Sequence, residues 1–181
     1  MDPITKLTEQ ANEEIGQWLF KKNWVESDAL EDAQRRFSEY MTDKDVRQGS
    51  ILKILSWEME LVREPDYLLD QIHFENLGYC DLNHYKIAKE IFSEFSLREC
   101  WATLTLPFDF SANTFYVATC YYHSETTRQH WEQRLRRNIV WYACDLSTLT
   151  INLEQMVAPP VPEKTQINEE KLEKPIIKEE E

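Results

Sequence analysis

The sequence predicts an α+β protein in which a helical N-terminal half packs on a small three-stranded α/β sandwich, followed by a disordered acidic C-terminal tail. Apolar residues recur at helical spacing through residues 1–75, the expected helical subdomain. Strand-forming runs alternate with helical patterns in residues 76–157, the expected α/β subdomain. Residues 158–181 hold four prolines, seven glutamates and no aromatic residue, so they cannot bury a core.

The helical half is expected to contain four helices. Apolar spacing places them at residues 4–19, 29–40, 51–61 and 66–74. Ser27 precedes the second helix as an N-cap, and Pro65 is expected to separate the third from the fourth. Gly78 is expected to end the fourth helix as a left-handed cap, because glycine adopts positive φ without strain.

Three strands and two helices are expected in the second half. The strands cover residues 100–106, 114–122 and 138–143, which are rich in β-branched and aromatic residues. The segment FDFSAN (108–113) is expected to form the turn between the first two strands. One helix is expected from Ser124 or Glu125 through Arg137, and a last short helix at 148–156.

The balance of charge excludes two classes of partner. The chain carries 33 acidic against 20 basic residues, a net charge of −13. Nucleic acid and anionic lipid both require the opposite excess, so neither is expected as a partner. The charge favours solubility and a basic protein partner. No apolar run reaches about 18 residues and the polar start is not typical of a secretory signal, so no membrane insertion is expected.

The glycines and cysteines exclude several kinds of site. Gly16, Gly49 and Gly78 lie too far apart for either common phosphate-binding loop, and neither GxSxG nor HExxH occurs. These absences exclude a P-loop ATPase, a Rossmann dehydrogenase and a zincin. We therefore expect no enzyme, no catalytic residue and no metal site, and an enzyme of an unfamiliar type is the remaining alternative. The four cysteines lie roughly twenty residues apart, which favours buried free thiols in a reducing cytoplasm and leaves a zinc site or disulfides as alternatives. These cysteines are Cys80, Cys100, Cys120 and Cys144.

The surroundings of Gly16 carry a family resemblance. A glycine inside a helix is less favourable than alanine by about 1 kcal/mol, yet Gly16 lies in the first expected helix. It is followed at fixed spacings by Leu19, Phe20, Val25, Leu30 and Ala33. This pattern resembles the motif RLGxxLVxxGxIxxxxLxxALxxQ, which is repeated at the start of type II secretion and type IV pilus assembly ATPases. A poorer second copy keeps Arg47, Gly49 and Leu52, and the resemblance covers about residues 8–157.

The resemblance implies a divergent, stand-alone version of the domain that precedes the ATPase core in that family. That domain docks the ATPase onto cytoplasmic parts of an inner-membrane platform protein. We therefore expect a non-enzymatic cytoplasmic module that acts as an adaptor or regulator of a secretion or pilus-type machine. Its expected partner is the ATPase or the platform protein, and it would lie at the inner membrane only through that partner.

The alternative that the resemblance implies is a cyclic di-GMP or other nucleotide sensor, because one branch of the family binds cyclic di-GMP through the tandem motif. The departures weigh against this alternative: Glu14 replaces the first arginine, Asn23 the second glycine and Phe37 the closing glutamine. The ligand-binding residues implied by the motif are Gly16, Leu19, Phe20, Leu30, Ala33, Arg47, Gly49 and Leu52.

The one basic cluster lies in RQHWEQRLRR (128–137). Arg134 and Arg137 share a helix face, so these two and Arg128 are candidates for docking an acidic partner. A solvated helix face is the alternative, because cations near a helix C-terminus favour its dipole. The cluster could also hold the chain's own acidic tail. His123 ends a strand, but no serine or cysteine is tied to it by a motif, so no catalytic role is assigned.

Overall fold

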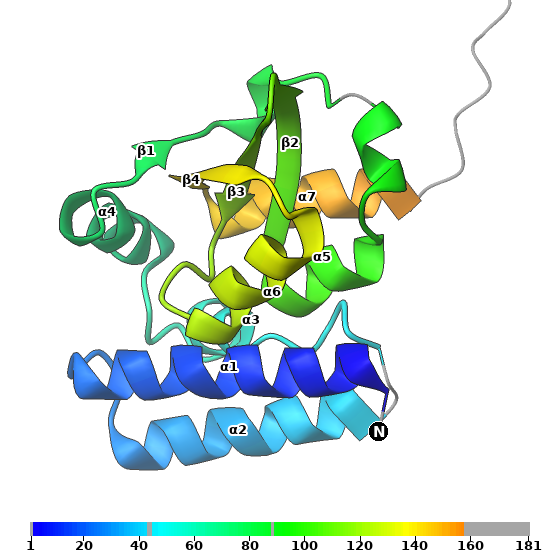
Figure 1. The fold of residues 1–181 in the computed structure, drawn as a ribbon. Coiled ribbons are helices and arrows are strands. Elements are labelled where there is room, and N and C mark those ends of the chain that lie inside the picture. Colours follow the sequence, from blue (N-terminus) through cyan, green and yellow to red (C-terminus); the bar gives the residue numbers. More distant parts are fainter. Residues whose placement is uncertain (1, 43–44, 88, 158–181) are drawn as a thin grey trace, which may run out of the picture.

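The computed structural model describes residues 2–42, 45–87 and 89–157 and confirms the α+β class. Figure 1 shows two long helices side by side, with a small sheet and its covering helices packed against one of them. The predicted acidic tail lies outside the described residues.

Helix α1 (Pro3–Lys21) contacts helices from both halves of the fold. Its buried face carries Leu7, Ala11, Ile15 and Leu19 at helical spacing. It packs on four helices, which are α2 (Ser27–Thr42), α3 (Ile51–Lys53), α5 (Leu97–Thr103) and α6 (Glu125–Leu135). The chain reverses between α1 and α2 through Asn23, which takes the left-handed conformation at φ 57°. Both helices agree with the prediction apart from a residue or two at each end.

The third predicted helix is shorter than expected. Helix α3 (Ile51–Lys53) continues as a π-helical turn (Ile54–Glu58) and ends before the predicted residue 61. The carbonyl of Leu55 then accepts hydrogen bonds from the backbone N–H groups of Leu61 and Val62, which turns the chain away. Helix α4 (Glu64–Phe74) begins with Pro65 in its first turn, where a missing N–H has no consequence.

The predicted cap at Gly78 is wrong. Asn76 takes the left-handed conformation instead, at φ 53°, and Gly78 begins the short strand β1 (Gly78–Tyr79). A Cβ at Gly78 would lie 2.8 Å from the ring of Tyr142, so the glycine is needed for close approach to a neighbouring strand. The sheet consequently has four strands where the sequence predicted three.

The sheet has the order β1-β4-β3-β2. Strand β4 (Asn138–Ala143) lies between β1 and β3 (Thr114–Thr119) and is parallel to both. Strand β2 (Thr105–Ser111) pairs antiparallel with β3 and forms one edge. The connection from β3 to β4 is α6 (Glu125–Leu135), and α7 (Leu146–Val157) follows β4.

The strand predicted at residues 100–106 is wrong in its first half. A capping box between Ser96 and Glu99 starts α5 (Leu97–Thr103), and Leu104 ends it at φ 40°. This local signal outweighs the strand propensity of the residues that follow it. Strand β2 then runs through Pro107, next to a register shift at the sheet edge, so most of FDFSAN is strand and not turn.

The core is continuous from α1 to α7 through the sheet. All four cysteines are buried within it as free thiols, as expected, and the Sγ atoms of Cys120 and Cys144 are 3.8 Å apart. Within the described ranges, no cluster of side chains is arranged to hold a metal ion. None of the helices in these ranges has the length and apolar character needed to span a bilayer.

Candidate functional site

Glu14, which stands where the motif resembled by the sequence has an arginine, joins α1 to the beginning of α6. The Glu14 carboxylate accepts hydrogen bonds from the Ser124 hydroxyl at 2.8 Å, from the Thr126 backbone N–H at 2.9 Å and from the Thr126 hydroxyl at 2.5 Å. Ser124 is the N-cap of α6 and also accepts from Thr127 N–H. A carboxylate is favoured at this place by the partial positive charge of a helix N-terminus.

Trp18 and His123 form a stacked pair one turn further along α1. Their ring centroids are 3.7 Å apart and their planes differ by 12°, and Tyr67 meets both rings edge-on. The His123 side chain is 1% exposed, with Nε2 3.3 Å from Asp70 Oδ2 and Nδ1 3.4 Å from Glu75 Oε1. Burial lowers the pKa of His123 to about 3, and the charges of Lys22 and Arg128 act in the same direction. His123 is therefore a neutral packing residue at pH 7.

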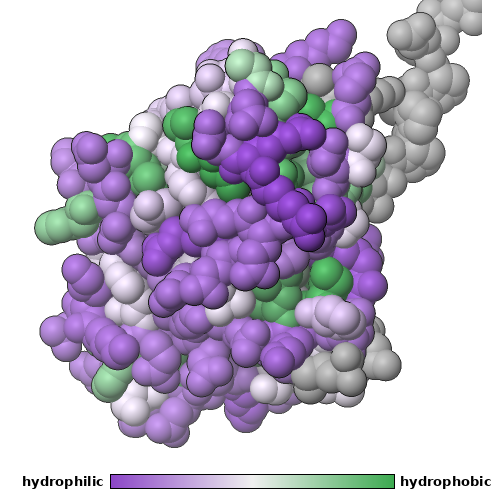
Figure 2. Space-filling view, viewed as in Figure 1, coloured by the Kyte–Doolittle hydropathy of each residue, from purple (hydrophilic) through white to green (hydrophobic). Residues whose placement is uncertain are grey.

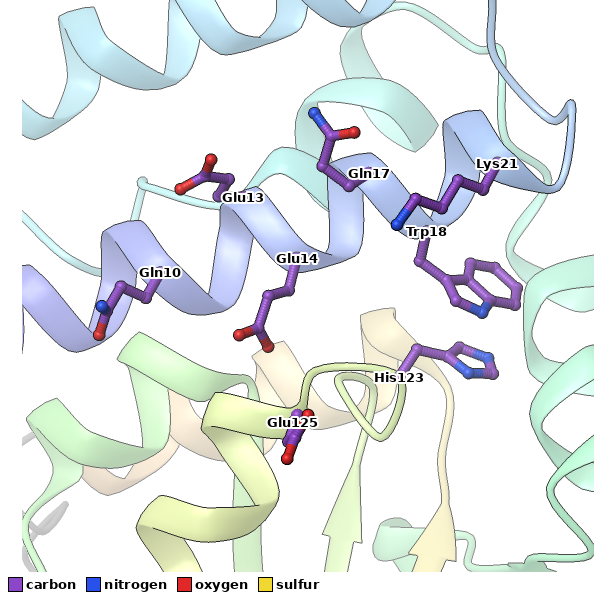
Figure 3. A pocket seen from close by; sticks show the side chains of 8 residues that line it. All are labelled: Gln10, Glu13, Glu14, Gln17, Trp18, Lys21, His123 and Glu125. Atoms are coloured by element: carbon purple, nitrogen blue, oxygen red, sulfur yellow. The ribbon is translucent and has the colours of Figure 1, made fainter.

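Glu14 and the stacked pair of Trp18 and His123 line one wall of a groove of about 510 Å³ between α1 and the beginning of α6 (Figure 3). Figure 3 shows Glu14 pointing from α1 toward the α6 side, whereas Glu13 and Gln17 point to the other side of the helix. The lining holds three carboxylates and one lysine, so it favours a polar partner with positive charge. The lining side chains are Gln10, Glu13, Glu14, Gln17, Trp18, Lys21, His123 and Glu125.

A buried polar network that the sequence did not indicate joins α1 to both halves of the fold. Asn12 accepts hydrogen bonds from the Ile51 backbone N–H at 2.7 Å and from the Tyr121 hydroxyl at 2.5 Å. Its amide nitrogen donates to the carbonyls of Thr8 and Gly49. Asn12 is 2% exposed, so these bonds satisfy a polar side chain inside the core. Its partners lie up to 109 residues away in the sequence, which no local motif could have shown.

Six of the eight motif residues predicted to bind a ligand lie in the packing between α1, α2 and α3. A Cβ at Gly16 would lie 2.9 Å from Leu30 Cδ1, and a Cβ at Gly49 would lie 2.5 Å from Met41 Sδ. Gly16 thus allows α1 to approach α2 closely, and Gly49 allows the segment before α3 to lie against α2. The six buried residues are Gly16, Leu19, Leu30, Ala33, Gly49 and Leu52.

The other two motif residues are accessible. The Phe20 side chain is 41% exposed at the end of α1. Arg47 is exposed and pairs with Asp45, whose carboxylate also accepts from the Arg47 backbone N–H. Phe20 and Arg47 are therefore exposed to solvent, whereas the other six motif residues are buried.

The three candidate docking arginines all contact the chain itself. Arg128 donates to the Tyr122 carbonyl at 2.6 Å, and Arg134 donates to Glu99 at 2.9 Å. Arg137 has its guanidinium 5.0 Å from the ring centroid of Phe110. Each still has an exposed part, so these contacts orient the side chains without covering them.

The surface above this core is largely polar. Figure 2 shows hydrophilic side chains over most of one face, with apolar side chains in separate small areas. The exposed large apolar side chains include Trp57, Leu61, Leu69 and Phe74.

Comparisons with known proteins identify the fold. No family model matches the chain, and no curated protein matches it. Among solved structures, the N-terminal domain of XpsE, a type II secretion ATPase, is similar with a TM-score of 0.50 and 14% identity over 77% of this chain and 92% of that chain. MshE, solved with cdg, has a TM-score of 0.49 and 13% identity over 77% of this chain and 96% of that chain. The expected fold resemblance is confirmed for the N-terminal domain of XpsE.

Proposed function

We propose that this chain is a non-enzymatic protein-docking module that serves as an adaptor or regulator of a secretion or pilus-type machine. The observation that carries the proposal is the fold shared with the N-terminal domain of XpsE, over nearly the whole of that domain. The sequence adds that no phosphate-binding loop is present, so an ATPase core does not accompany the fold in these 181 residues.

The proposed partner is a secretion or pilus ATPase, or the cytoplasmic part of an inner-membrane platform protein. The groove between α1 and α6 is the proposed contact, because its lining combines exposed carboxylates with the edge of an aromatic stack. Such a lining suits a basic segment of a partner, and the net charge of −13 favours the same approach at long range. On this proposal the protein is cytoplasmic and reaches the inner membrane only through its partner.

Affinity capture from cells of the source organism tests the proposal. The wild-type chain should enrich a secretion or pilus ATPase or a platform protein over empty resin. Exchanging Glu13 and Glu125 for lysine should reduce that enrichment, because both line the groove outside the Glu14 contact. The matched control exchanges Glu31 and Glu132, which are exposed away from the groove. Enrichment of no envelope or secretion component would refute the proposed class.

Nucleotide sensing is the second candidate function, and it rests on the motif around Gly16 and Gly49. Cyclic di-GMP binding would require α1 to separate from α2 and α3, because six of the eight motif residues are buried between them. Calorimetry with cyclic di-GMP at high micromolar concentration distinguishes the candidates. Heat that disappears in Arg47→Ala would support sensing, and no heat in the wild type would exclude it.

A further inference from the structure

Three of the four cysteines lie in a row at one end of the sheet. Cys80, Cys144 and Cys120 come directly after the last residues of β1, β4 and β3, and β4 runs parallel to both of its neighbours. The last residues of β1 and β3 both pair with Ala143, so the three cysteines follow at matching positions. Side chains at matching positions of neighbouring parallel strands lie on the same face of a sheet. The three thiols are therefore neighbours inside the core, and each cysteine is at most 2% exposed.

The thiols of Cys120 and Cys144 are in contact. Their Sγ atoms are 3.8 Å apart, and Sγ of Cys120 donates a weak hydrogen bond to the Cys144 carbonyl at 3.4 Å. A disulfide requires an S–S distance of about 2.05 Å and Cα atoms about 4.4 to 6.8 Å apart. Neighbouring strands are separated by about 4.8 Å, which lies within that range. Each sulfur would therefore need to move by only about 1 Å to join the ends of β3 and β4.

A small cavity lies between this pair and an open groove. Both thiol residues line the cavity, whose volume of about 10 Å³ gives room for one water-sized molecule. Ser56 and Glu64 line the cavity and also line a groove of about 520 Å³ at the beginning of α4. The Glu64 carboxylate accepts hydrogen bonds from the Trp57 indole N–H and from a backbone N–H in the first turn of α7. Movement of this one side chain would therefore open a route from the groove to the thiols.

We propose that Cys120 and Cys144 are an oxidation site at which hydrogen peroxide, entering past Glu64, produces a reversible disulfide. One sulfur attacks a peroxide oxygen and the O–O bond breaks, so that the thiol becomes a sulfenic acid and water leaves. The second sulfur then attacks the sulfenic sulfur, and its proton leaves with the hydroxyl group as a second water. The two thiols lose two electrons in total, and one peroxide is reduced to two waters. A dithiol reductant returns both thiols by exchange.

The surroundings of the pair determine the rate and the selectivity of this reaction. The hydrogen bond with Cys120 and burial both raise the pKa of Cys144, so its thiolate is scarce and the oxidation is slow. The contact between the two sulfurs makes the second step intramolecular, which favours the disulfide over further oxidation by a second peroxide. Cys100 lies on α5, outside the row of thiols, and burial raises its pKa well above the ordinary value. Cys100 should therefore stay a thiol.

Peroxide treatment of the folded 181-residue chain, followed by peptide mass spectrometry, tests this proposal. Remaining thiols are alkylated in denaturant, and the chain is digested without reductant. Millimolar peroxide should produce a peptide that links Cys120 to Cys144 and lower the number of free thiols from four to two, and dithiothreitol should restore all four. The midpoint of thermal unfolding should rise by about 5 to 10 °C, because the link joins residues 24 apart in the sequence.

Matched variants test the pair and the route separately. Cys120→Ser and Cys144→Ser should each abolish the linked peptide, whereas Cys100→Ser should leave it unchanged. Circular dichroism of each variant shows whether a loss comes from misfolding. Glu64→Ala should make the link form several-fold faster, because it removes a side chain between the groove and the cavity. Arg63→Ala is its control, since Arg63 lines the groove but not the cavity.

Four results would overturn the proposal. The first is a folded chain that keeps all four thiols in millimolar peroxide. The second is a link from Cys144 to Cys80, and the third is a link that forms only in urea or between two chains, because neither uses the contact between Cys120 and Cys144. The fourth is an equal rate of oxidation in Glu64→Ala and Arg63→Ala, which would exclude entry past Glu64.

Discussion

Replacing Glu14 with alanine should destabilise the protein by about 2 to 3 kcal/mol. The change removes three hydrogen bonds that a carboxylate accepts from Ser124 and Thr126. Bonds to charged acceptors contribute about 1.5 to 3 kcal/mol each in favourable cases, but this site is only partly buried and water replaces part of the loss. The favourable position at the α6 N-terminus adds about 0.5 kcal/mol. About 0.5 to 0.8 kcal/mol for each of the three bonds, together with this gain at the helix terminus, gives the total of about 2 to 3 kcal/mol.

Urea unfolding followed by tryptophan fluorescence measures this change, because Trp18 packs next to the contact. The midpoint of thermal unfolding should fall by about 5 to 10 °C, since about 1 kcal/mol corresponds to 2 to 4 °C for a domain of this size. Glu14→Gln keeps an acceptor without the charge and should lose about half as much. A double-mutant cycle with Thr126→Ala should give a coupling energy of about 1 kcal/mol.

Glu13→Ala is the matched control. Glu13 is the preceding residue on α1, it is exposed, and it forms no side-chain hydrogen bond within the described residues. Its removal should change the free energy of unfolding by less than about 0.5 kcal/mol. Equal effects of Glu14→Ala and Glu13→Ala would show that the carboxylate does not join α1 to α6.

Three further predictions concern pH and the buried network. His123 takes up a proton near pH 6.5 when unfolded but only near pH 3 when folded, so wild-type stability should fall below pH 6.5 by about 1.4 kcal/mol per pH unit, whereas His123→Gln should lack this slope in urea titrations. Burial raises the pKa of Glu99, but hydrogen bonds from His130 and Ser96 and the charge of Arg134 together outweigh it and lower the pKa to about 2. The contribution of Glu99 to the free energy of unfolding should therefore be complete above about pH 4.5 and be lost as the pH falls toward 2, and Glu99→Gln should remove that dependence. Asn12→Ala should lower the free energy of unfolding by about 3 kcal/mol, measured in urea, because it leaves the buried Ile51 N–H without its acceptor; an effect below about 1 kcal/mol would contradict this reading.

The helices were predictable because their signals are local. Apolar spacing placed α1 and α2 correctly, and the same rule found α6. The error at residues 100–103 is also instructive, because the capping residues Ser96 and Glu99 are visible in the sequence. Strand propensity reflects how well a side chain packs on a half-buried pleated surface. The same apolar side chains also pack well in a helix that is buried on all sides. Composition alone therefore could not decide between the two.

The candidate site was not predictable from spacing, because its parts come together only in the folded chain. Glu14 and Thr126 lie 112 residues apart, and Trp18 meets His123 across a similar separation. The sequence did show that Glu14 stands where the related motif has an arginine. It could not show where that carboxylate points, since the direction depends on how α6 approaches α1.

The exchange of charge at position 14 changes what the fold can recognise. A cation on α1 would face the positive end of the α6 dipole and would be favoured only if an anion lay between them. Glu14 fills that place from within the chain, and its hydrogen bonds leave no need for an external anion there. The remaining groove side chains then present more negative than positive charge to solvent. A carboxylate of the chain itself thus completes the packing of α1 on α6, and the charge that remains in the groove supports the proposal of a basic protein segment as the partner.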